Sequence, residues 1–273
     1  MKIVSSALEL KELLRKEKGS IGFVPTMGAL HEGHLTLIRE SKKANDITVV
    51  SIFVNPTQFL QGEDLEKYPR RDEADKKICE VAGVDYLFMP SADEMYGEDE
   101  PQIQAPEVRG YILEGATRPG HFSGVLTVVM KLLNIVSPTR AYFGKKDAQQ
   151  LFLIEQMVKS YFLDVKIIPV DTVRENDGLA LSSRNVYLSK KERKDALKIP
   201  ASLNLARSLI TQGILETEEI TAKMKEELSP LQVEYVAIVS RDFKYLKQIE
   251  IGNTIILVEA IVGTTRLLDN IWI

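Results

Sequence analysis

Short runs of β-branched and apolar residues alternate with helical patterns over the first two-thirds of the chain. The predicted strands cover residues 21–24, 47–54, 85–89, 141–143 and 165–170. The predicted helices cover residues 34–44, 71–81, 125–136 and 147–161. Strands separated by helices predict an α/β fold, with a parallel sheet that carries helices on both faces. In such a sheet, ligands bind outside the carboxyl ends of the strands.

The pattern changes after about residue 175. Helices are predicted over residues 190–209 and 217–228, with Thr217 as the N-cap of the second. Strands over 233–239, 255–260 and 264–268 then follow in succession. We therefore expect domains at 1–175 and 176–273, the second a smaller C-terminal α+β domain, with the segment 174–188 joining them.

Charge and cysteine content limit the class of protein. The 273 residues carry a net charge of −4, which argues against a nucleic-acid-binding face. No apolar run is long enough for a membrane span, and the charged start of the chain does not resemble a signal peptide. Cys79 is the single cysteine, and we expect it to be a buried, inert thiol in a cytoplasmic protein.

The segment Pro25–His34 directly follows the first predicted strand and reads Pro-Thr-Met-Gly-Ala-Leu-His-Glu-Gly-His. Gly28 and Gly33 allow close approach of the backbone to a ligand. A helix that starts near Gly33 would direct free N–H groups at phosphate oxygens. His31 and His34 are three residues apart, so both rings can reach one point. This pattern predicts contact with a phosphate, but two ordinary surface or capping histidines, or a metal site, remain alternatives. A zinc site would need a third protein ligand.

Polar and glycine-rich segments follow other predicted strands. Asn55 and Gln58 end the second strand and offer neutral groups to hydroxyls and carboxylates, although a polar turn is the alternative. Arg118–Gly124 joins a cation and an imidazole to a glycine-rich loop, and an ordinary connection would have the same composition.

Two later segments carry positive charge. Lys145 and Lys146 stand at a predicted helix start, where they oppose the helix dipole, so an anion there would relieve the conflict. An ordinary capped helix with exposed lysines is the alternative. Ser182-Ser183-Arg184 offers two hydroxyls and a guanidinium, a compact anion site or simply a helix cap beside a solvated arginine.

The string Phe23–His34, together with these later segments in the same order, resembles the pantothenate synthetase family. His-x-Gly-His is similar to the signature of the wider nucleotidyltransferase superfamily, and Ser182–Arg184 is similar to its mobile Lys-Met-Ser-Lys-Ser loop. The resemblance covers nearly all of the first two-thirds of the chain and implies a Rossmann-like first domain, with the second closing over the active site.

The resemblance also implies roles for individual residues. It makes His34, His31, Lys145 and Arg184 catalytic. It places ATP at Met27, Gly28, Ala29, Leu30, His31, Glu32, Gly33, His34, Gly144, Lys145, Lys146, Asp147, Val173, Leu181, Ser182, Ser183 and Arg184. It places pantoate and β-alanine at Thr26, Met27, Asn55, Gln58, Tyr68, Arg118, His121 and Gln150. The family has more consecutive aspartates near Asp72 and Asp75, so no role for these carboxylates follows.

The implied reaction has two steps. ATP adenylates (R)-pantoate with release of pyrophosphate, and β-alanine then displaces AMP to give pantothenate. Mg²⁺ would be bound mainly through the ATP phosphates, with no protein metal site, and the enzyme would be a homodimer. Another nucleotidyl-transferring enzyme and a nucleotide-binding sensor with the same fold are the rival functions.

Overall fold

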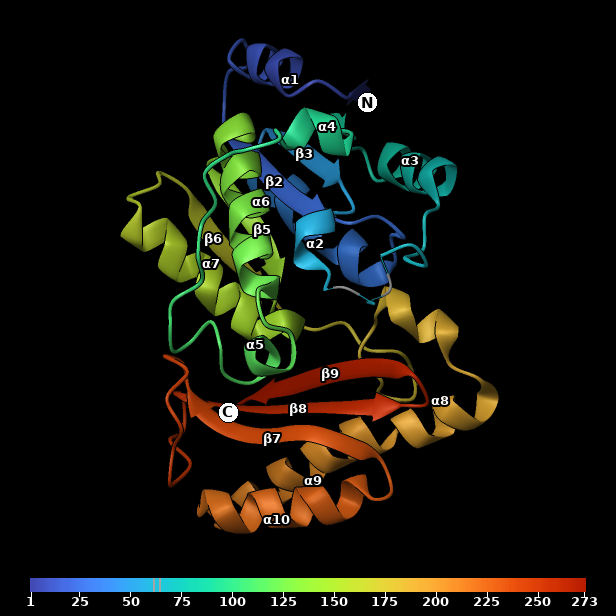
Figure 1. The fold of residues 1–273 in the computed structure, drawn as a ribbon, viewed down its shortest axis with the longest axis vertical. Helices are drawn as coiled ribbons and strands as arrows, with labels where there is room; N and C mark the ends of the chain where they lie inside the picture. Colours follow the sequence, from blue (N-terminus) through green and yellow to red (C-terminus); the bar gives the residue numbers. More distant parts are fainter. Residues whose placement is uncertain (61, 64) are drawn as a thin grey trace. The chain divides into compact units, whose positions relative to one another are not determined.

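The computed structural model describes residues 1–60, 62–63 and 65–273 (Figure 1). The chain forms two compact units. The N-terminal unit comprises Met1–Lys145 and Leu153–Asp171, and the C-terminal unit comprises Lys146–Phe152 and Thr172–Ile273. The predicted boundary between residues 175 and 176 falls inside the C-terminal unit.

The N-terminal unit contains a six-stranded parallel sheet in the order β1-β4-β3-β2-β5-β6. Its strands are β1 (Lys2–Val4), β2 (Ile21–Thr26), β3 (Ile47–Ile52), β4 (Tyr86–Phe88), β5 (Arg140–Gly144) and β6 (Lys166–Val170). The predicted α/β fold is confirmed, and the three-residue edge strand β1 was not predicted.

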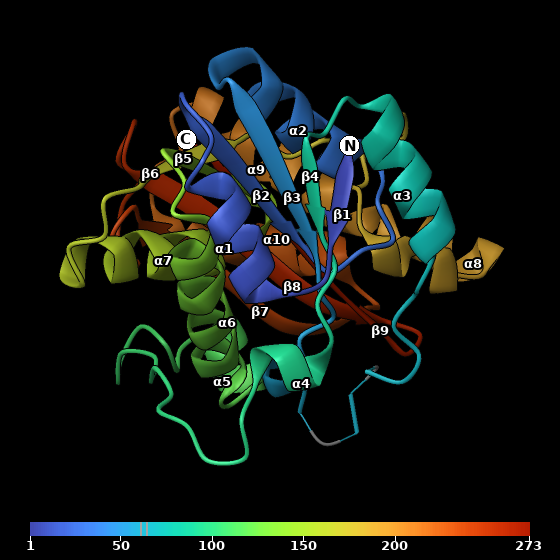
Figure 2. The same ribbon diagram turned by 90° about the horizontal axis from the view of Figure 1, so that it is seen from above.

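Helices cover both faces of this sheet. They are α1 (Ala7–Leu14), α2 (Glu32–Ala44), α3 (Asp72–Val81), α4 (Ala92–Met95), α5 (Glu114–Thr117), α6 (His121–Val136) and α7 (Ala148–Ser160), with short 3₁₀ turns η1 (Pro56–Gln58) and η2 (Lys145–Asp147). Helices α2 and α3 lie on one face, and α1 and α6 lie on the other (Figure 2). Cys79 of α3 is fully buried, as predicted, and burial raises the pKa of its thiol to about 12.

Strand register brings the predicted motifs of this unit to one edge of the sheet. Thr26 of β2 pairs with Ile52 of β3, so the segments that follow them leave the sheet together. Gly144 of β5 pairs with Val170 of β6 at the same edge. The parallel arrangement therefore gathers sequence-distant turns, as the sequence predicted.

The C-terminal unit contains an antiparallel sheet of β7 (Gln232–Ser240), β8 (Thr254–Val262) and β9 (Thr265–Trp272). Its helices are α8 (Lys190–Ala196), α9 (Lys198–Thr211) and α10 (Thr217–Leu228), preceded by the 3₁₀ turn η3 (Ser183–Tyr187). Helices α9 and α10 pack on one sheet face through an aliphatic core that includes Leu203, Ile220, Ile238 and Val258. The predicted α+β architecture is confirmed.

Three local predictions were wrong. Strand β2 does not end before Pro25 but continues to Thr26. Pro25 has no N–H, and β5 pairs only with Gly22 and Phe23, so the pairing with β5 requires no hydrogen bond from Pro25. The predicted helix over 190–209 is interrupted at Leu197, since Pro200 has no N–H to bond the preceding turn. Thr217 is not an N-cap.

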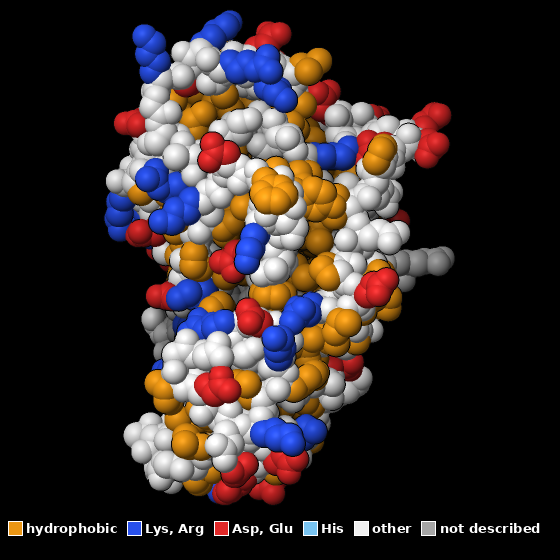
Figure 3. Space-filling view, turned by 90° about the vertical axis from the view of Figure 1, so that its left-hand side faces the viewer, with side chains coloured by type: hydrophobic (Ala, Val, Ile, Leu, Met, Phe, Trp, Pro, Cys, Tyr) orange, Lys and Arg blue, Asp and Glu red, His pale blue; other side chains and the backbone are white. Residues whose placement is uncertain are grey.

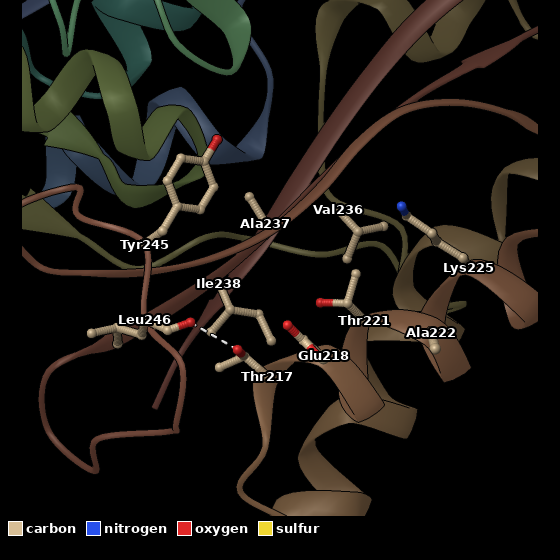
Figure 4. Close-up of a pocket in the computed structure, with 10 residues that line it drawn as sticks. All are labelled: Thr217, Glu218, Thr221, Ala222, Lys225, Val236, Ala237, Ile238, Tyr245 and Leu246. Atoms are coloured by element: carbon tan, nitrogen blue, oxygen red, sulfur yellow. Dashed lines mark hydrogen bonds between the residues drawn. The ribbon is translucent and has the colours of Figure 1, made fainter.

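The hydroxyl of Thr217 donates instead to the carbonyl of Leu246 at 2.7 Å, and Glu216 holds the cap position without a side-chain bond. Thr217 and Leu246, which this bond joins, line a cavity of about 410 Å³ between α10 and β7 (Figure 4). Lys225 and Tyr245 also line this cavity, and its lining contains no residue that the sequence assigned to a ligand.

Acidic and basic side chains are interspersed on the face of the molecule shown in Figure 3. This distribution accompanies the small net charge of −4. Among the described helices, none combines the length and the apolar character that a membrane crossing requires.

Candidate active site

The two motif histidines cap helix α2 with their own rings. His31 Nδ1 accepts from the Gly33 N–H at 3.2 Å, and His34 Nδ1 accepts from the His31 N–H at 3.3 Å. The ring centroids are 4.1 Å apart. Because a nitrogen that accepts carries no proton, this geometry assigns the proton of each neutral ring to Nε2. Each imidazole can therefore donate from Nε2.

This arrangement corrects the expected role of Gly33 and gives Glu32 a different setting. The Gly33 N–H is not a free donor, because His31 takes it, and a Cβ at Gly33 would lie 2.9 Å from the His31 ring. Glu32 pairs with Arg39 on the exposed side of α2, and its hydrogen bond with Arg39 lowers the pKa of the Glu32 carboxyl. The donors that the motif offers to a phosphate are thus side-chain rather than main-chain groups at these positions.

A buried carboxylate holds the turn before the histidines. Asp75 of α3 is 1% exposed and accepts 2.8 Å hydrogen bonds from the N–H groups of Ala29 and Leu30. Gly28 and Ala29 have φ of 83° and 50°, and a Cβ at Gly28 would lie 3.1 Å from the carboxylate. Burial raises the pKa of Asp75, and the two backbone bonds oppose this shift. Asp75 therefore occupies the main-chain donors of two residues that the resemblance places at ATP.

The hydroxyl of Thr26 completes the same turn. It donates to the carbonyl of Ser51 at 2.8 Å and accepts from the Gly28 N–H at 3.2 Å. Thr26 was predicted to bind pantoate, but here its side chain joins β2 to β3.

Asn55 acts on its neighbour Gln58. Asn55 is 1% exposed, and its Nδ2 donates to Gln58 Oε1 and to the Gly124 carbonyl, both at 3.2 Å. Its Oδ1 accepts from the Tyr96 hydroxyl at 2.6 Å. Gln58 Nε2 is directed at Met27 Sδ, 2.8 Å away. Asn55 therefore orients Gln58, whose amide points toward residues 27–34, called the histidine turn below.

Arg118 and His121 form a buried network behind Gln58. Arg118 makes a bidentate pair with Glu63 at 2.7 and 2.8 Å and bonds Glu114 at 3.0 Å. Burial opposes its charge, but Glu63 and Glu114 outweigh it and raise the pKa of Arg118. His121 Nδ1 donates to the Gln58 carbonyl at 2.7 Å while its Nε2 lies 3.0 Å from Arg118 Nη1.

His121 thus has the tautomer opposite to that of His31 and His34, and burial lowers its pKa. Besides the two carboxylates, Arg118 also donates to the Gln58 backbone carbonyl at 3.4 Å. Tyr68, also predicted at the substrate pocket, is 6% exposed and packs edge-on against Phe59.

Lys145 follows Gly144 at the end of β5. Its ammonium lies 2.5 Å from Asp171, whose side chain is 88% exposed. An ion pair with so exposed a partner is weak, and a polyanion can replace the carboxylate. Lys145 is therefore suited to a phosphate.

The remaining candidates lie in the C-terminal unit. The Leu181 N–H donates to the Val173 carbonyl at 3.0 Å, which brings two predicted ATP segments side by side. Ser182 caps the turn η3 by accepting from the Arg184 N–H at 3.3 Å. Ser183 is the first residue of that turn.

Ion pairs and a hydrogen bond hold residues 175–185, which contain Ser182–Arg184 and are called the serine–arginine segment below. Arg193 of α8 binds Glu175 with two bonds of 2.8 and 2.9 Å and binds Asp177 at 2.6 Å. Asn185 donates to Glu175 at 2.9 Å. These contacts join the segment to α8 within its own unit, and the mobility of the loop stays a prediction.

The last predicted site residues lie in or just after the turn η2, Lys145–Asp147, which is called the lysine turn below. Lys146 Nζ lies 3.2 Å from Asp147 Oδ1, and Gln150 lies in the first turn of α7. Within residues 1–60, 62–63 and 65–273, no three His, Cys, Asp or Glu side chains are grouped as a metal site would need.

Sequence reasoning missed the residues that hold these motifs, chiefly Asp75, Glu63, Tyr96 and Asn270. Asp75 had a detectable signal, since it shares the inward face of α3 with Cys79 four residues later. A charged residue on an apolar helix face indicates a specific partner. The others have no comparable signal, because their partners are distant in sequence.

Comparison with known proteins places these features in a family. The family model described as pantoate-beta-alanine ligase matches residues 2–272. The pantothenate synthetases of Sulfurimonas denitrificans and Aliarcobacter butzleri are 63% and 58% identical over 273 residues, covering all of both chains.

Solved structures agree with the sequence relatives. The pantothenate synthetase of Thermus thermophilus superposes with a TM-score of 0.95 at 43% identity and covers 99% of each chain. The pantoate-beta-alanine ligase of Francisella tularensis, complexed with beta-gamma ATP and beta-alanine, gives 0.83 at 38% identity and covers 100% of this chain and 97% of its own.

Proposed function

The chain belongs to the pantoate–β-alanine ligase family, and from this premise we propose how its own residues perform the reaction. It is an enzyme that joins pantoate to β-alanine with consumption of ATP. In the first step, a pantoate carboxylate oxygen attacks the α-phosphorus and pyrophosphate leaves. In the second, the β-alanine amine attacks the acyl carbon, AMP leaves and an amine proton is released.

The first step brings an anion to a polyanion, so donors and cations must gather at the phosphates. We assign the donor role to His31 and His34. The observation that supports this assignment is that both rings cap the start of α2 through Nδ1. With both Nδ1 atoms engaged by backbone N–H groups, Nε2–H is the donor that each ring offers. His34 then stabilises charge at the α-phosphate, and His31 is the second imidazole beside it.

The cations come from three positions, Lys145, Lys146 and Arg184. Lys145 carries an exchangeable partner, Asp171, at the sheet edge that the histidine turn also leaves. The role of Arg184 on the same ATP rests on the likeness of Ser182–Arg184 to the family motif. Closure of the C-terminal unit over the active site is proposed on the same ground.

The acid substrate is assigned to the neighbourhood of Gln58 and Met27. Asn55 holds the side-chain amide of Gln58, and the His121 network holds the backbone carbonyl of the same residue. Its Nε2, now directed at Met27 Sδ, can donate to a hydroxyl or carboxylate of pantoate. Fixed orientation of this kind converts binding into positioning of the nucleophile.

Mg²⁺ fits this site only as an ion carried by its substrate. The described residues offer no acidic cluster, and Mg²⁺ commonly binds through substrate phosphates with one or two carboxylates. Of the two carboxylates in the ATP set, Glu32 pairs with Arg39, and Asp147, beside Lys146, is the one that could assist. The ion would neutralise phosphate charge when bound.

Pantoate-dependent exchange of pyrophosphate into ATP tests the adenylation step. We expect exchange with ATP and pantoate and no β-alanine. Exchange that is independent of pantoate would indicate a different nucleotidyl transfer, and ATP binding without exchange or ligation would indicate a sensor.

His34→Asn sharpens the test, because its Oδ1 can replace Nδ1 in the cap while the Nε2–H donor is lost. We expect exchange to fall by about 10²–10³-fold with ATP binding largely kept. Undiminished exchange would remove His34 from the mechanism.

A cytoplasmic homodimer is also proposed, from the resemblance to the family. Sedimentation of the purified chain at low and high concentration tests the dimer. A single species of monomer mass at both concentrations would contradict it.

A further inference from the structure

One side chain of the C-terminal strand is bonded to the lysine turn. Asn270 of β9 is 3% exposed, and its Nδ2 donates to the Lys146 carbonyl at 2.7 Å. Its Oδ1 accepts from Trp272 Nε1 at 2.8 Å. All three residues belong to the C-terminal unit. The amide of Asn270 therefore joins the indole to the backbone of the lysine turn.

The preceding residue of β9 holds a second predicted ATP segment. Asp269 is 2% exposed, and its carboxylate accepts from Arg174 at 2.5 and 2.9 Å. Arg174 also donates to the Asn270 carbonyl at 3.2 Å and directly follows Val173. Two adjacent residues of one strand thus hold both the turn at Lys146 and the start of the serine–arginine segment.

The bond from Asn270 has a specific mechanical consequence. The Lys146 carbonyl belongs to the peptide that leads into Asp147, so the bond fixes the rotation of that peptide. The directions of the Lys146 and Asp147 side chains depend on this rotation. The Asn270 side chain supplies the donor and the backbone carbonyl of Lys146 supplies the acceptor. The bond therefore uses no backbone N–H group that a phosphate would need.

We propose that Asn270 is a positioning residue for ATP, acting through the Lys146 carbonyl, and that Trp272 reports nucleotide binding through Asn270. The inference rests on the proposed function, which places ATP at the lysine turn. Trp272 is the single tryptophan of the chain, so fluorescence excited at wavelengths that tyrosine does not absorb comes from this position alone. Its ring also lies against Arg241, 4.2 Å from the guanidinium carbon.

Asn270→Asp isolates the relevant bond. The aspartate keeps the shape and keeps an acceptor for Trp272 Nε1, but it cannot donate to the Lys146 carbonyl when ionised. Asn204→Asp is the matched control, since Asn204 is an exposed residue of α9 in the same unit. Asn270→Leu removes both bonds without adding charge and serves if the aspartate prevents folding.

ATP binding to the full-length protein is measured by Trp272 fluorescence and, independently, by equilibrium dialysis. We expect a saturable fluorescence change in the wild type. Asn270→Asp should raise the ATP dissociation constant by about tenfold, the scale of one buried hydrogen bond left unmade. The KM for pantoate should change by less than about twofold, since a local change in one subsite leaves independent contacts intact. Asn204→Asp should match the wild type in every measurement.

The inference is overturned if dialysis shows ATP bound equally by the wild type and both Asn270 variants. It is also overturned if bound ATP leaves the Trp272 emission unchanged, or if the variants lose folding stability with no change in ATP affinity. If the wild type itself does not bind ATP, the proposed function fails together with the inference.

Discussion

The histidine turn is braced by side-chain acceptors, whereas the C-terminal unit combines side-chain donors with acceptors such as Ser182 Oγ, which takes the Arg184 N–H. In the N-terminal unit, the carboxylate of Asp75 accepts from two backbone N–H groups, and the two histidines accept from two more. In the C-terminal unit, Arg174 and Asn270 donate to backbone carbonyls.

A phosphate is an acceptor, so it competes with the first kind of brace and not with the second. At the histidine turn, four backbone N–H groups already have intramolecular acceptors, so the donors that we propose for the nucleotide are the imidazoles. In the C-terminal unit, the bonds from Arg174 and Asn270 occupy backbone carbonyls, which a phosphate does not use.

Arg184→Ala gives the largest effect that this comparison predicts. The variant removes a charged donor that no brace of its segment can replace. We expect a loss of about 10³-fold in kcat/KM for ATP, the scale of an arginine at a transferring phosphoryl group. Steady-state kinetics measure it, with exposed Arg207→Ala of α9 as the control. A loss equal to that of the control would mean that Arg184 does not touch the nucleotide.

Asp75→Asn tests the brace of the histidine turn. The amide keeps one acceptor but places an NH₂ against a backbone N–H, so the turn loses its shape. We expect kcat/KM to fall by about 10–100-fold, from about 1–3 kcal/mol for a buried unsatisfied group.

Asp72→Asn, on the exposed first turn of the same helix, is the matched control. Glutamate at position 75 should restore part of the activity if two acceptor atoms are what the turn needs. Wild-type activity in Asp75→Asn would show that the turn holds without its carboxylate.

Asp75 and the ion pairs of Arg193 should also respond oppositely to pH, which is the smallest effect. The pKa of Asp75 is raised, so its contribution to folding stability is fully present below its ordinary value of 3.8 and is lost as pH rises through the folded pKa. Hydrogen bonds from Arg193 lower the pKa of Glu175 and Asp177. Their contribution is present above the ordinary values of 4.5 and 3.8 and is lost as pH falls.

Urea unfolding over a series of pH values separates the two cases. The stability advantage of the wild type over Arg193→Met should be below about 1 kcal/mol, because the pairs are partly exposed, and should shrink on acidification. The advantage over Asp75→Asn should instead decrease as pH rises. Parallel pH curves for the two variants would contradict the comparison.

Most of the fold followed from the sequence, because periodicity is local. The β-branched runs at residues 21–24 and 47–54 and the helical spacing at 71–81 each encode their element within a few residues. The errors at Pro200 and Thr217 arose where a backbone constraint or a distant carbonyl outweighed the local pattern.

The site was predictable only in its motifs. Sequence alone gathered His31, His34 and Lys145 by the rule that parallel strands end at one edge. It could not assign what Asn55 and Arg118 do, because a side chain's partner decides whether it faces a ligand or another residue. Asp75 bonds Leu30 across 45 positions, and Asn270 bonds Lys146 across 124.

The central claim concerns which imidazole nitrogen carries the proton, and ¹⁵N NMR of the three histidines measures it directly. The account predicts that neutral His31 and His34 are protonated at Nε2, and that His121 is protonated at Nδ1. Addition of ATP should then perturb the Nε2 signals of the first two and leave His121 nearly unchanged. Protonation of His31 and His34 at Nδ1 would contradict the mutual cap and the donor role assigned to both rings.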